Sequence, residues 1–266
     1  MRDDPTAAHT ARFAALVARP ARDVPLDEAA ACLAAHAHPA LDVDAVLDRL
    51  DTLARLVPAP TVDGVRRLLF DDLGFAGNRD DYYDPRNSLL DEVLERRLGI
   101  PITLSLLTIE VARRVGVGLV GVGMPGHFLV RDAADETAFV DPFNGGRRLD
   151  ADGCAALYRA AQGPGAAFDG RWLQPVGATE ILVRMLTNLR AIYAQRRDQP
   201  ALVWVTRLRA AMPAATAAAW REHATVLAAT GRLLDAAQAY ERAADLAGPR
   251  GDADAVMATR LRARLN

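Results

Sequence analysis

The 266-residue sequence contains no lysine, so all 32 of its basic residues are arginines. This absence excludes a P-loop lysine that binds nucleotide phosphates, a Schiff-base lysine and a serine–lysine catalytic dyad. Serine and cysteine are nearly absent as well, since the chain has only Ser88, Ser105, Cys32 and Cys154. Neither serine lies in a G-x-S-x-G motif, and two cysteines are too few for a disulfide framework. The sequence therefore offers few side chains for nucleophilic catalysis.

The charge and hydropathy of the chain are those of an ordinary globular protein. Its 34 acidic residues nearly balance the arginines, and the formal net charge of −2 leaves no basic footprint for nucleic acid. No apolar run reaches the roughly 18 residues that a membrane helix needs. The first five residues lack the pattern of a signal peptide, and the low cysteine content is typical of a reducing compartment. We therefore expect a cytoplasmic protein that binds neither nucleic acid nor a membrane.

The hydrophobic pattern divides the chain into three segments. Residues 1–73 and 178–266 have apolar residues at helical spacing, which predicts a helical N-terminal region and a helical C-terminal region. Residues 74–177 are predicted to form an α+β core, in which two helices precede a small antiparallel sheet. Three short apolar runs rich in β-branched residues predict its strands, at 119–124, 127–131 and 137–141. The expected fold class is thus α+β, with a mostly helical chain around this core.

A polar, turn-rich loop precedes the first core helix, and long loops of this kind are often functional. Ser88 and Asp91 have the spacing of a capping box, which predicts that the helix begins at Ser88. At helical spacing Ser88, Glu92 and Arg96 share one face, and together with Asn87 they are candidates for the polar wall of a binding cleft. The alternative is structural: Asn87 and Ser88 cap the helix, while Glu92 pairs with Arg96.

His127 differs from the other four histidines because it follows Pro125-Gly126 and begins an apolar run. Asp141 ends the next predicted strand, fourteen residues later. Strands joined by a loop of this length pair as neighbours, so Asp141 can lie beside His127. A carboxylate there would orient the imidazole and favour its protonated form. The alternative is a packed histidine at a strand end and an aspartate in a turn.

No pattern in the sequence predicts a metal or cofactor site. His36 and His38 share a short segment, but no Cys, Asp or third His follows them at zinc-site spacing, so we interpret the segment as a solvated helix end. Residues 116–121 match G-x-G-x-x-G, yet they follow a helix and precede a strand, which is the reverse of the dinucleotide-binding order. We therefore expect neither a metal ion nor a cofactor.

Four ordered motifs in the core resemble the SirB-type branch of the transglutaminase-like superfamily. They are YYDPRNS (82–88), EVLERRLGIPITLS (92–105), GMPGHFLV (123–130) and DPFNGG (141–146). The resemblance implies a papain-like core, a helical region before it and tetratricopeptide-like helices after it. It also implies a Cys–His–Asp triad for acyl transfer or amide hydrolysis, in which His127 and Asp141 match the second and third positions.

The first position of that triad does not match. The nucleophile would lie near residues 101–103, where the chain has no cysteine. Thr103 and Ser105 carry hydroxyls, which are far poorer nucleophiles than a thiolate unless they are strongly activated. Cys32 lies in an alanine-rich run typical of a buried helix face. Cys154 follows a predicted helix N-terminus that can lower a thiol pKa, but it comes after the triad aspartate and so has the wrong chain order.

The C-terminal helices resemble tetratricopeptide repeats. The spacing of Leu227, Gly231 and Tyr240 matches the 34-residue pattern of that repeat, and Pro213 and Pro249 are 36 residues apart. A helical bundle without repeats is the alternative, because alanine-rich helices match many patterns by chance.

Three functions remain open at this point. The first is a non-catalytic transglutaminase-like protein that binds a peptide or protein in its cleft and docks a protein partner on its C-terminal helices. The second is a hydrolase or acyltransferase that uses His127 and Asp141 with Thr103, Ser105 or water as the nucleophile. The third is a purely structural helical scaffold. A hydroxyl within about 3.2 Å of the imidazole would favour catalysis, and a closed apolar surround would favour a scaffold.

Overall fold

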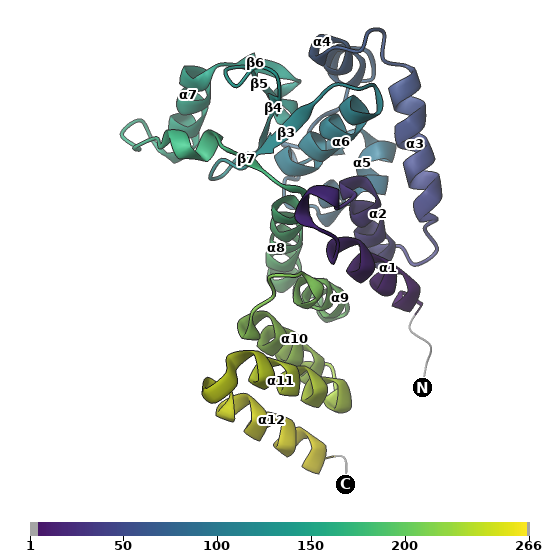
Figure 1. Ribbon diagram of the computed structural model, residues 1–266, viewed down its shortest axis with the longest axis vertical. Helices are drawn as coiled ribbons and strands as arrows, with labels where there is room; N and C mark the ends of the chain where they lie inside the picture. Colours follow the sequence, from purple (N-terminus) through teal and green to yellow (C-terminus); the bar gives the residue numbers. More distant parts are fainter. Residues whose placement is uncertain (1–4, 265–266) are drawn as a thin grey trace. The chain divides into compact units, whose positions relative to one another are not determined.

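The computed structural model describes residues 5–264. The chain divides into two compact units: residues 20–185, here called the core unit, and the residues before and after them, here called the C-terminal unit. Helices in both units and one small antiparallel sheet make this a mostly helical α+β protein, as the hydrophobic pattern predicts (Figure 1). The boundary predicted after residue 73 falls inside the core unit.

Polar side chains cap the starts of two helices near the beginning of the core unit, α3 (Val43–Arg55) and α4 (Val62–Arg66). Asp42 accepts a hydrogen bond from the Asp44 N–H, and the Thr61 hydroxyl accepts one from the Gly64 N–H. Both side chains thereby satisfy a backbone donor that has no partner inside the helix. Helix α2 (Leu26–Ala37) precedes them, and a π-helix (Arg67–Asp72) follows.

Helix α6 (Pro101–Arg114) is the central helix of the core unit. Its residues 101–108 are all buried. Pro101 occupies the first helical position, where no N–H is needed, and Gly116, with a φ of 77°, follows the last turn. The helix packs against α2, α3 and α4, and it also packs against the sheet. Its N-terminal turns are therefore enclosed by the rest of the unit.

An antiparallel sheet of five short strands has the order β6-β5-β4-β3-β7. Helix α7 (Ala151–Gln162) packs on it through a cluster that includes Leu129, Phe139 and Cys154. The strands are β3 (Leu119–Val122), β4 (Leu129–Asp132), β5 (Phe139–Asp141), β6 (Arg147–Leu149) and β7 (Pro175–Val176). The three predicted strands are present, but the prediction that His127 begins one of them is wrong, because the residues before Leu129 form a turn.

A second, two-stranded sheet ties the polar loop to the core. Strand β1 (Ala76–Gly77) pairs in parallel with β2 (Leu98–Gly99). Helix α5 (Leu90–Arg96) lies between them in the chain, and Arg97, which follows its last residue, has a left-handed φ of 58°. The helix is shorter at its start than the capping pattern predicts, since a 3-10 turn (Pro85–Ser88) precedes it.

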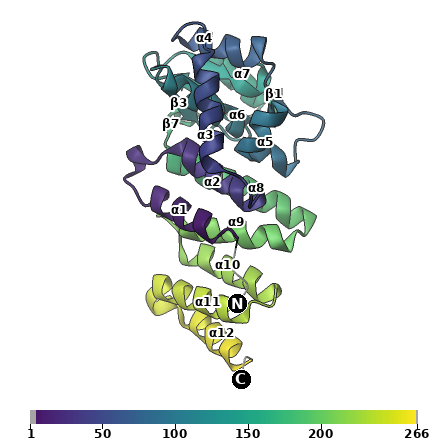
Figure 2. The same cartoon turned by 90° about the vertical axis from the view of Figure 1, so that its right-hand side faces the viewer.

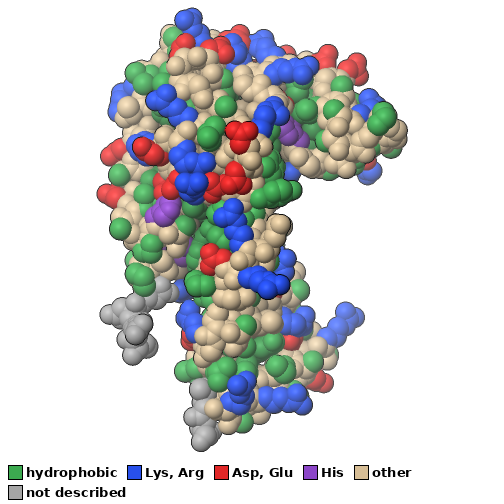
Figure 3. Space-filling view, turned by 180° about the vertical axis from the view of Figure 1, so that it is seen from behind, with side chains coloured by type: hydrophobic (Ala, Val, Ile, Leu, Met, Phe, Trp, Pro, Cys, Tyr) green, Lys and Arg blue, Asp and Glu red, His purple; other side chains and the backbone are tan. Residues whose placement is uncertain are grey.

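A buried ion network joins α2, α3 and α6. The Asp27 carboxylate lies 2.9 Å from Arg113 and 2.6 Å from Arg114. Arg114 also contacts Glu110 and Asp51. Burial acts to raise the pKa of Asp27, but the hydrogen bonds and charge of Arg114 outweigh it, so that pKa lies below its ordinary value. Burial, and then repulsion from Asp27, raise the pKa of Glu110. On the face that Figure 3 shows, arginine and acidic side chains also lie close together at the surface.

The described part of the C-terminal unit is helical throughout. Helix α8 (Ala178–Arg196) begins in the core unit and continues into this one. The next four helices pack pairwise in chain order (Figure 2), and Gly231, with a φ of 78°, forms the turn between α10 and α11. The remaining helices are α1 (Ala7–Val17), α9 (Gln199–Ala211), α10 (Ala217–Ala229), α11 (Leu233–Ala247) and α12 (Asp252–Ala263). From residue 5 to residue 264, no helix is both long and apolar enough to cross a membrane.

Candidate functional site

A tight turn positions His127 just before β4. The His127 N–H donates to the Met124 carbonyl oxygen at 3.0 Å, and Gly126 between them has a φ of 75°. Pro125 followed by a glycine at positive φ is typical of a type II turn. The Arg184 guanidinium donates to the carbonyl oxygens of both Met124 (3.1 Å) and His127 (2.8 Å), so the turn is held at both of its ends.

The carboxylate of Asp141 lies beside the His127 ring. The His127 Nε2 and Asp141 Oδ1 atoms are 2.9 Å apart, because β4 and β5 are antiparallel neighbours. Asp141 is 1% exposed, and it also accepts hydrogen bonds from the backbone N–H (3.3 Å) and side-chain amide (2.5 Å) of Asn144. The predicted proximity of this pair is confirmed. A carboxylate held in this way fixes the orientation and tautomer of the ring.

Aromatic side chains line the space around His127. The Phe143 ring lies edge-on to the imidazole at 6.0 Å and edge-on to Tyr82 at 5.9 Å. Tyr82 in turn contacts Tyr83, whose side chain is 63% exposed. Gly77 makes this arrangement possible, since a Cβ there would lie 2.5 Å from the Phe143 ring. Phe143, after β5, and Tyr82 and Tyr83 of the polar loop thus form an aromatic surface that extends from the imidazole to the exposed Tyr83 ring.

Arg184 brings a half-buried positive charge to the same site. Its guanidinium lies 5.3 Å above the Phe128 ring, and within residues 5–264 no carboxylate pairs with it. Burial lowers the pKa of this guanidinium, and the neighbouring Tyr82 acts in the opposite direction. Burial likewise raises the pKa of the Tyr82 hydroxyl. A partly desolvated cation without a counter-ion favours an electron-rich group nearby, and the carbonyl oxygens of Met124 and His127 supply part of that interaction.

The two candidate hydroxyls do not face the imidazole. Thr103 Oγ1 donates to the Asn87 carbonyl oxygen at 2.7 Å, and Ser105 Oγ lies 3.5 Å from the Phe128 carbonyl oxygen. Both residues are fully buried in α6. In the part of the chain that the structure describes, no hydroxyl is hydrogen-bonded to His127, and His127 Nδ1 has no partner. The predicted hydroxyl nucleophiles are therefore occupied by structural contacts.

Neither cysteine is placed to replace them. Cys32 is fully buried in α2, as the alanine-rich run predicts. Cys154 is fully buried beneath the sheet. Burial, together with the negative charges of Asp141 and Asp150, raises the pKa of the Cys154 thiol to about 12. A helix N-terminus can lower the pKa of a thiol, but here the pKa is raised, because desolvation has the larger effect and keeps the thiol protonated.

Asn87 and Ser88 lie inside the core unit and are fully buried. The Asn87 Oδ1 accepts hydrogen bonds from Asn78 (3.0 Å) and Arg96 (3.3 Å), and its Nδ2 donates to the Asp81 carbonyl oxygen at 2.7 Å. Asn87 therefore holds the polar loop together. The Ser88 hydroxyl is buried and has no hydrogen-bond partner among the described residues, so the predicted capping box does not form.

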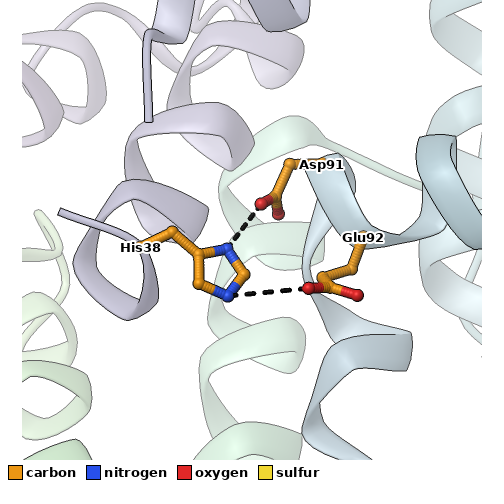
Figure 4. A group of neighbouring side chains, drawn as sticks. All are labelled: His38, Asp91 and Glu92. Atoms are coloured by element: carbon orange, nitrogen blue, oxygen red, sulfur yellow. Dashed lines mark hydrogen bonds and ion pairs between the residues drawn. The ribbon is translucent and has the colours of Figure 1, made fainter. Parts of the chain in front are cut away.

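Glu92 and Arg96 do not pair with each other. Arg96 Nη2 lies 3.5 Å from Asp84, whereas Glu92 Oε1 lies 3.6 Å from the Nε2 of His38. His38 also lies 2.6 Å from Asp91 (Figure 4). The sequence gives no sign of this acidic partner for His38, because 53 residues separate it from Asp91 and only the packing of α2 on α5 brings them together.

Sequence reasoning missed three residues around His127, namely Tyr82, Phe143 and Arg184. The two aromatic residues lie inside the motifs that carry the family resemblance, so their position in these motifs could have indicated them as site residues. No sequence signal indicated Arg184, because it lies 57 residues beyond His127 on a helix with an ordinary hydrophobic pattern. Its role depends on where α8 meets the turn before β4.

Comparison with known proteins shows the family of the chain. The family described as the transglutaminase-like superfamily matches residues 32–187, which is more than half of the chain and includes both His127 and Asp141. The chain belongs to the transglutaminase-like superfamily. This confirms the superfamily part of the resemblance seen in the motifs. No solved structure gives a significant match.

Several curated relatives share the central part of the chain. A UPF0162 protein of Xylella fastidiosa (strain Temecula1) is 52% identical over 134 residues, which cover 49% of this chain and 48% of that protein. A UPF0162 protein of Pseudomonas aeruginosa is 37% identical over 179 residues, covering 64% of this chain and 65% of the relative. Human F-box only protein 21 is 36% identical over 140 residues, which cover 49% of this chain and 21% of that protein. The match thus spans about half the length of the Xylella relative.

Proposed function

We propose that this chain is a non-catalytic transglutaminase-like protein of the SirB-type branch, whose His127 site binds a peptide segment. The observation that carries the proposal is the absence, among the described residues, of a nucleophile hydrogen-bonded to His127. Thr103 Oγ1 is bonded to the Asn87 carbonyl oxygen, and Ser105 is buried against the Phe128 carbonyl oxygen. The buried Cys154 thiol, with its pKa of about 12, stays protonated at neutral pH.

The side chains around His127 suit a peptide ligand. Tyr82 and Tyr83 offer exposed aromatic surface, which binds side chains with little loss of conformational entropy. Arg184 offers a guanidinium without a carboxylate partner in the described chain, and the free Nδ1 of His127 can bond to a backbone amide or carbonyl. The preferred ligand is therefore a peptide with an aromatic or apolar anchor and a nearby acceptor group.

The C-terminal helices suit a second, protein-docking role. Helices α9 to α12 pack pairwise in chain order, which is compatible with tetratricopeptide-like hairpins. On this proposal the protein acts in the cytoplasm and engages a protein partner through these helices, the peptide site or both.

A peptide selection tests the proposed function. The wild-type protein is panned against a phage-displayed peptide library, and the affinity of the selected peptides is measured by calorimetry. Tyr83→Ala is expected to weaken binding at least about tenfold, because it removes exposed aromatic contact area without touching the core. Leu56→Ala, at an exposed apolar residue outside the site, is the matched control and is expected to bind normally. Equal affinity in both variants would contradict the proposal.

A second candidate function rests on the His127–Asp141 pair itself. Asp141 holds Nε2 of the ring and leaves Nδ1 unpaired, which is the arrangement of a general base. Such a base could activate water for slow hydrolysis of an amide or ester. A scaffold role, the third possibility, would leave the aromatic surface around His127 without a ligand.

A further inference from the structure

A pocket of about 390 Å³ lies among α9, α10 and α11, within the C-terminal unit. Figure 1 shows these three helices stacked in chain order. Arg207 of α9, Arg232 just before α11 and Arg242 of α11 line the pocket. Asp235 is the one carboxylate among the described residues that line it. The pocket thus has an excess of positive charge, although the formal net charge of the chain is −2.

One ion pair leaves this excess largely uncompensated. The Arg232 guanidinium lies 2.8 Å from the Asp235 carboxylate. Arg242 is exposed, and no hydrogen bond or ion pair joins it to another residue between 5 and 264. Guanidinium groups bind carboxylates through two parallel hydrogen bonds. The charge of the pocket therefore favours a ligand that carries carboxylates.

A buried histidine in the pocket points independently to a missing ligand. His223 is 7% exposed, and its ring lines the pocket. The Thr206 hydroxyl donates to the Leu202 carbonyl oxygen at 2.7 Å, so it accepts the hydrogen bond from His223 Nδ1 at 2.9 Å. The other ring nitrogen, Nε2, has no hydrogen-bond partner in the part of the chain that the structure describes. A polar atom of a buried side chain without a partner is unfavourable and requires an explanation.

The unpaired Nε2 of His223 is a hydrogen-bond acceptor. Burial, and then the charges of Arg207 and Arg232, lower the pKa of His223 to about 4, while Asp235 acts in the opposite direction. The ring is therefore neutral at pH 7, and because Nδ1 holds the proton, Nε2 carries a free lone pair. A ligand that satisfies the whole pocket must present a donor to Nε2 and acceptors to the arginines.

We propose that this pocket binds an acidic peptide segment of a partner protein. A backbone N–H of the segment donates to His223 Nε2, and its carboxylates accept hydrogen bonds from the arginines. A small carboxylate anion has no N–H for the histidine, and nucleic acid requires a broader basic surface than a chain of net charge −2 offers. Trp220, partly buried against the cluster of α10 to α12, offers aromatic surface to an apolar side chain beside the acidic ones. This inference rests on the docking role proposed above for the C-terminal helices and names the chemistry that they recognise.

A peptide array probed with the full-length protein tests the pocket. The array holds peptides of varied sequence that each contain several aspartates or glutamates, and each has a twin in which these are replaced by asparagine or glutamine. We expect the wild-type protein to bind a subset of the acidic peptides. The best of them is labelled with fluorescein, and its affinity is measured by fluorescence anisotropy. Its amide twin is expected to bind at least about tenfold more weakly, because the charged hydrogen bonds to the arginines are lost.

Substitutions at exposed arginines locate the binding site. Arg232→Gln combined with Arg242→Gln is expected to weaken binding of the labelled peptide at least about tenfold, and neither side chain is part of the core. Arg260→Gln, at an exposed arginine of α12 outside the pocket, is the matched control and should bind normally. Tyr83→Ala, which alters the His127 site, should also leave this affinity unchanged, so that the two peptide sites are distinguished.

NMR of the His223 ring gives a readout on the wild-type protein. In protein labelled with ¹⁵N at histidine, the Nε2 signal of His223 is expected to shift when the peptide is added, because this nitrogen gains a hydrogen bond. An unmoved signal at saturating peptide, equal binding of the acidic peptides and their twins, or equal affinity of the double arginine variant and Arg260→Gln would each overturn this inference alone. Binding of no peptide to the C-terminal helices would also contradict the docking role. A single-stranded oligonucleotide that binds more tightly than any acidic peptide would overturn the inference and assign the pocket to nucleic acid.

Discussion

The imidazole of His127 is bonded to Asp141 on one side only. Oδ1 of Asp141, a residue that is 1% exposed, lies 2.9 Å from Nε2, while Nδ1 has no partner among the described residues. The hydroxyls of Thr103 and Ser105 are directed to backbone carbonyl oxygens instead. Among residues 5–264 no hydroxyl or thiol is hydrogen-bonded to this ordered imidazole. This asymmetry determines what activity measurements should show.

We expect the wild-type protein and the His127→Ala variant to hydrolyse p-nitrophenyl acetate and a peptide anilide at the same low rate. The reason is that no described nucleophile is hydrogen-bonded to the ring. A positioned general base usually contributes at least about a hundredfold. A wild-type rate exceeding that of His127→Ala by such a factor, with equal circular dichroism spectra, would support the hydrolase alternative. Ser105→Ala, measured beside it, would then separate a hydroxyl nucleophile from water.

Cys154 should resist thiol reagents in the native state. Burial raises the pKa of its thiol to about 12, so almost no thiolate exists between pH 7 and pH 9. Iodoacetamide labelling followed by peptide mass spectrometry is expected to detect little modification of this residue in the native protein and complete modification in guanidinium. Rapid and selective alkylation of native Cys154 would show that it is accessible, and would reopen the question of a cysteine nucleophile.

Asp27→Asn should destabilise the core unit by ~2 kcal/mol at pH 7, because it removes the buried carboxylate that Arg113 and Arg114 share and leaves Arg114 with Glu110 and Asp51 only. Asp51→Asn removes a half-exposed partner of the same arginine and should cost less than ~1 kcal/mol. Urea unfolding followed by circular dichroism measures both changes.

The effect of Asp27→Asn should also depend on pH. The pKa of Asp27 is lower in the folded protein than its ordinary value of 3.8, so the stabilisation it provides is present above that value and is lost as the pH falls through the folded-state pKa. We therefore expect the difference between wild type and variant to shrink when the unfolding is repeated near pH 3. A difference that stays constant would mean that packing, and not the charge, accounts for the loss.

Gly77→Ala should disturb the aromatic surface around His127. A Cβ at this position would lie 2.5 Å from the Phe143 ring, and overpacking of this kind typically costs ~1–3 kcal/mol. The expected result is a lower denaturation midpoint together with shifted NMR signals of the Phe143 and His127 rings. Gly170→Ala is the control, since no atom lies within 4 Å of the added methyl group. Equal stability of the two variants would show that the Phe143 ring can move without cost.

Local chemistry explains why much of the fold was predictable. Thr61 caps α4, Pro101 starts α6 and Gly116 follows its last turn, because each of these effects involves atoms only a few residues apart. The prediction that failed also concerned residues that are close together in the chain. Ser88 and Asp91 have capping-box spacing, but the turn at Pro85–Ser88 displaces the helix start to Leu90. Two local patterns competed there, and the spacing does not show which one forms.

The sequence by itself determined the α+β class, the helices that enclose the core, the neighbouring positions of His127 and Asp141, and the absence of a cysteine at the start of α6. These depend on periodicity and on strands that are adjacent in the chain. Only the tertiary structure decided that Thr103 donates to the Asn87 carbonyl oxygen, that Arg184 holds the turn at His127, and that Asp91 meets His38. The physical reason is that these contacts join segments 16 to 57 residues apart, and packing alone brings their atoms within bonding distance.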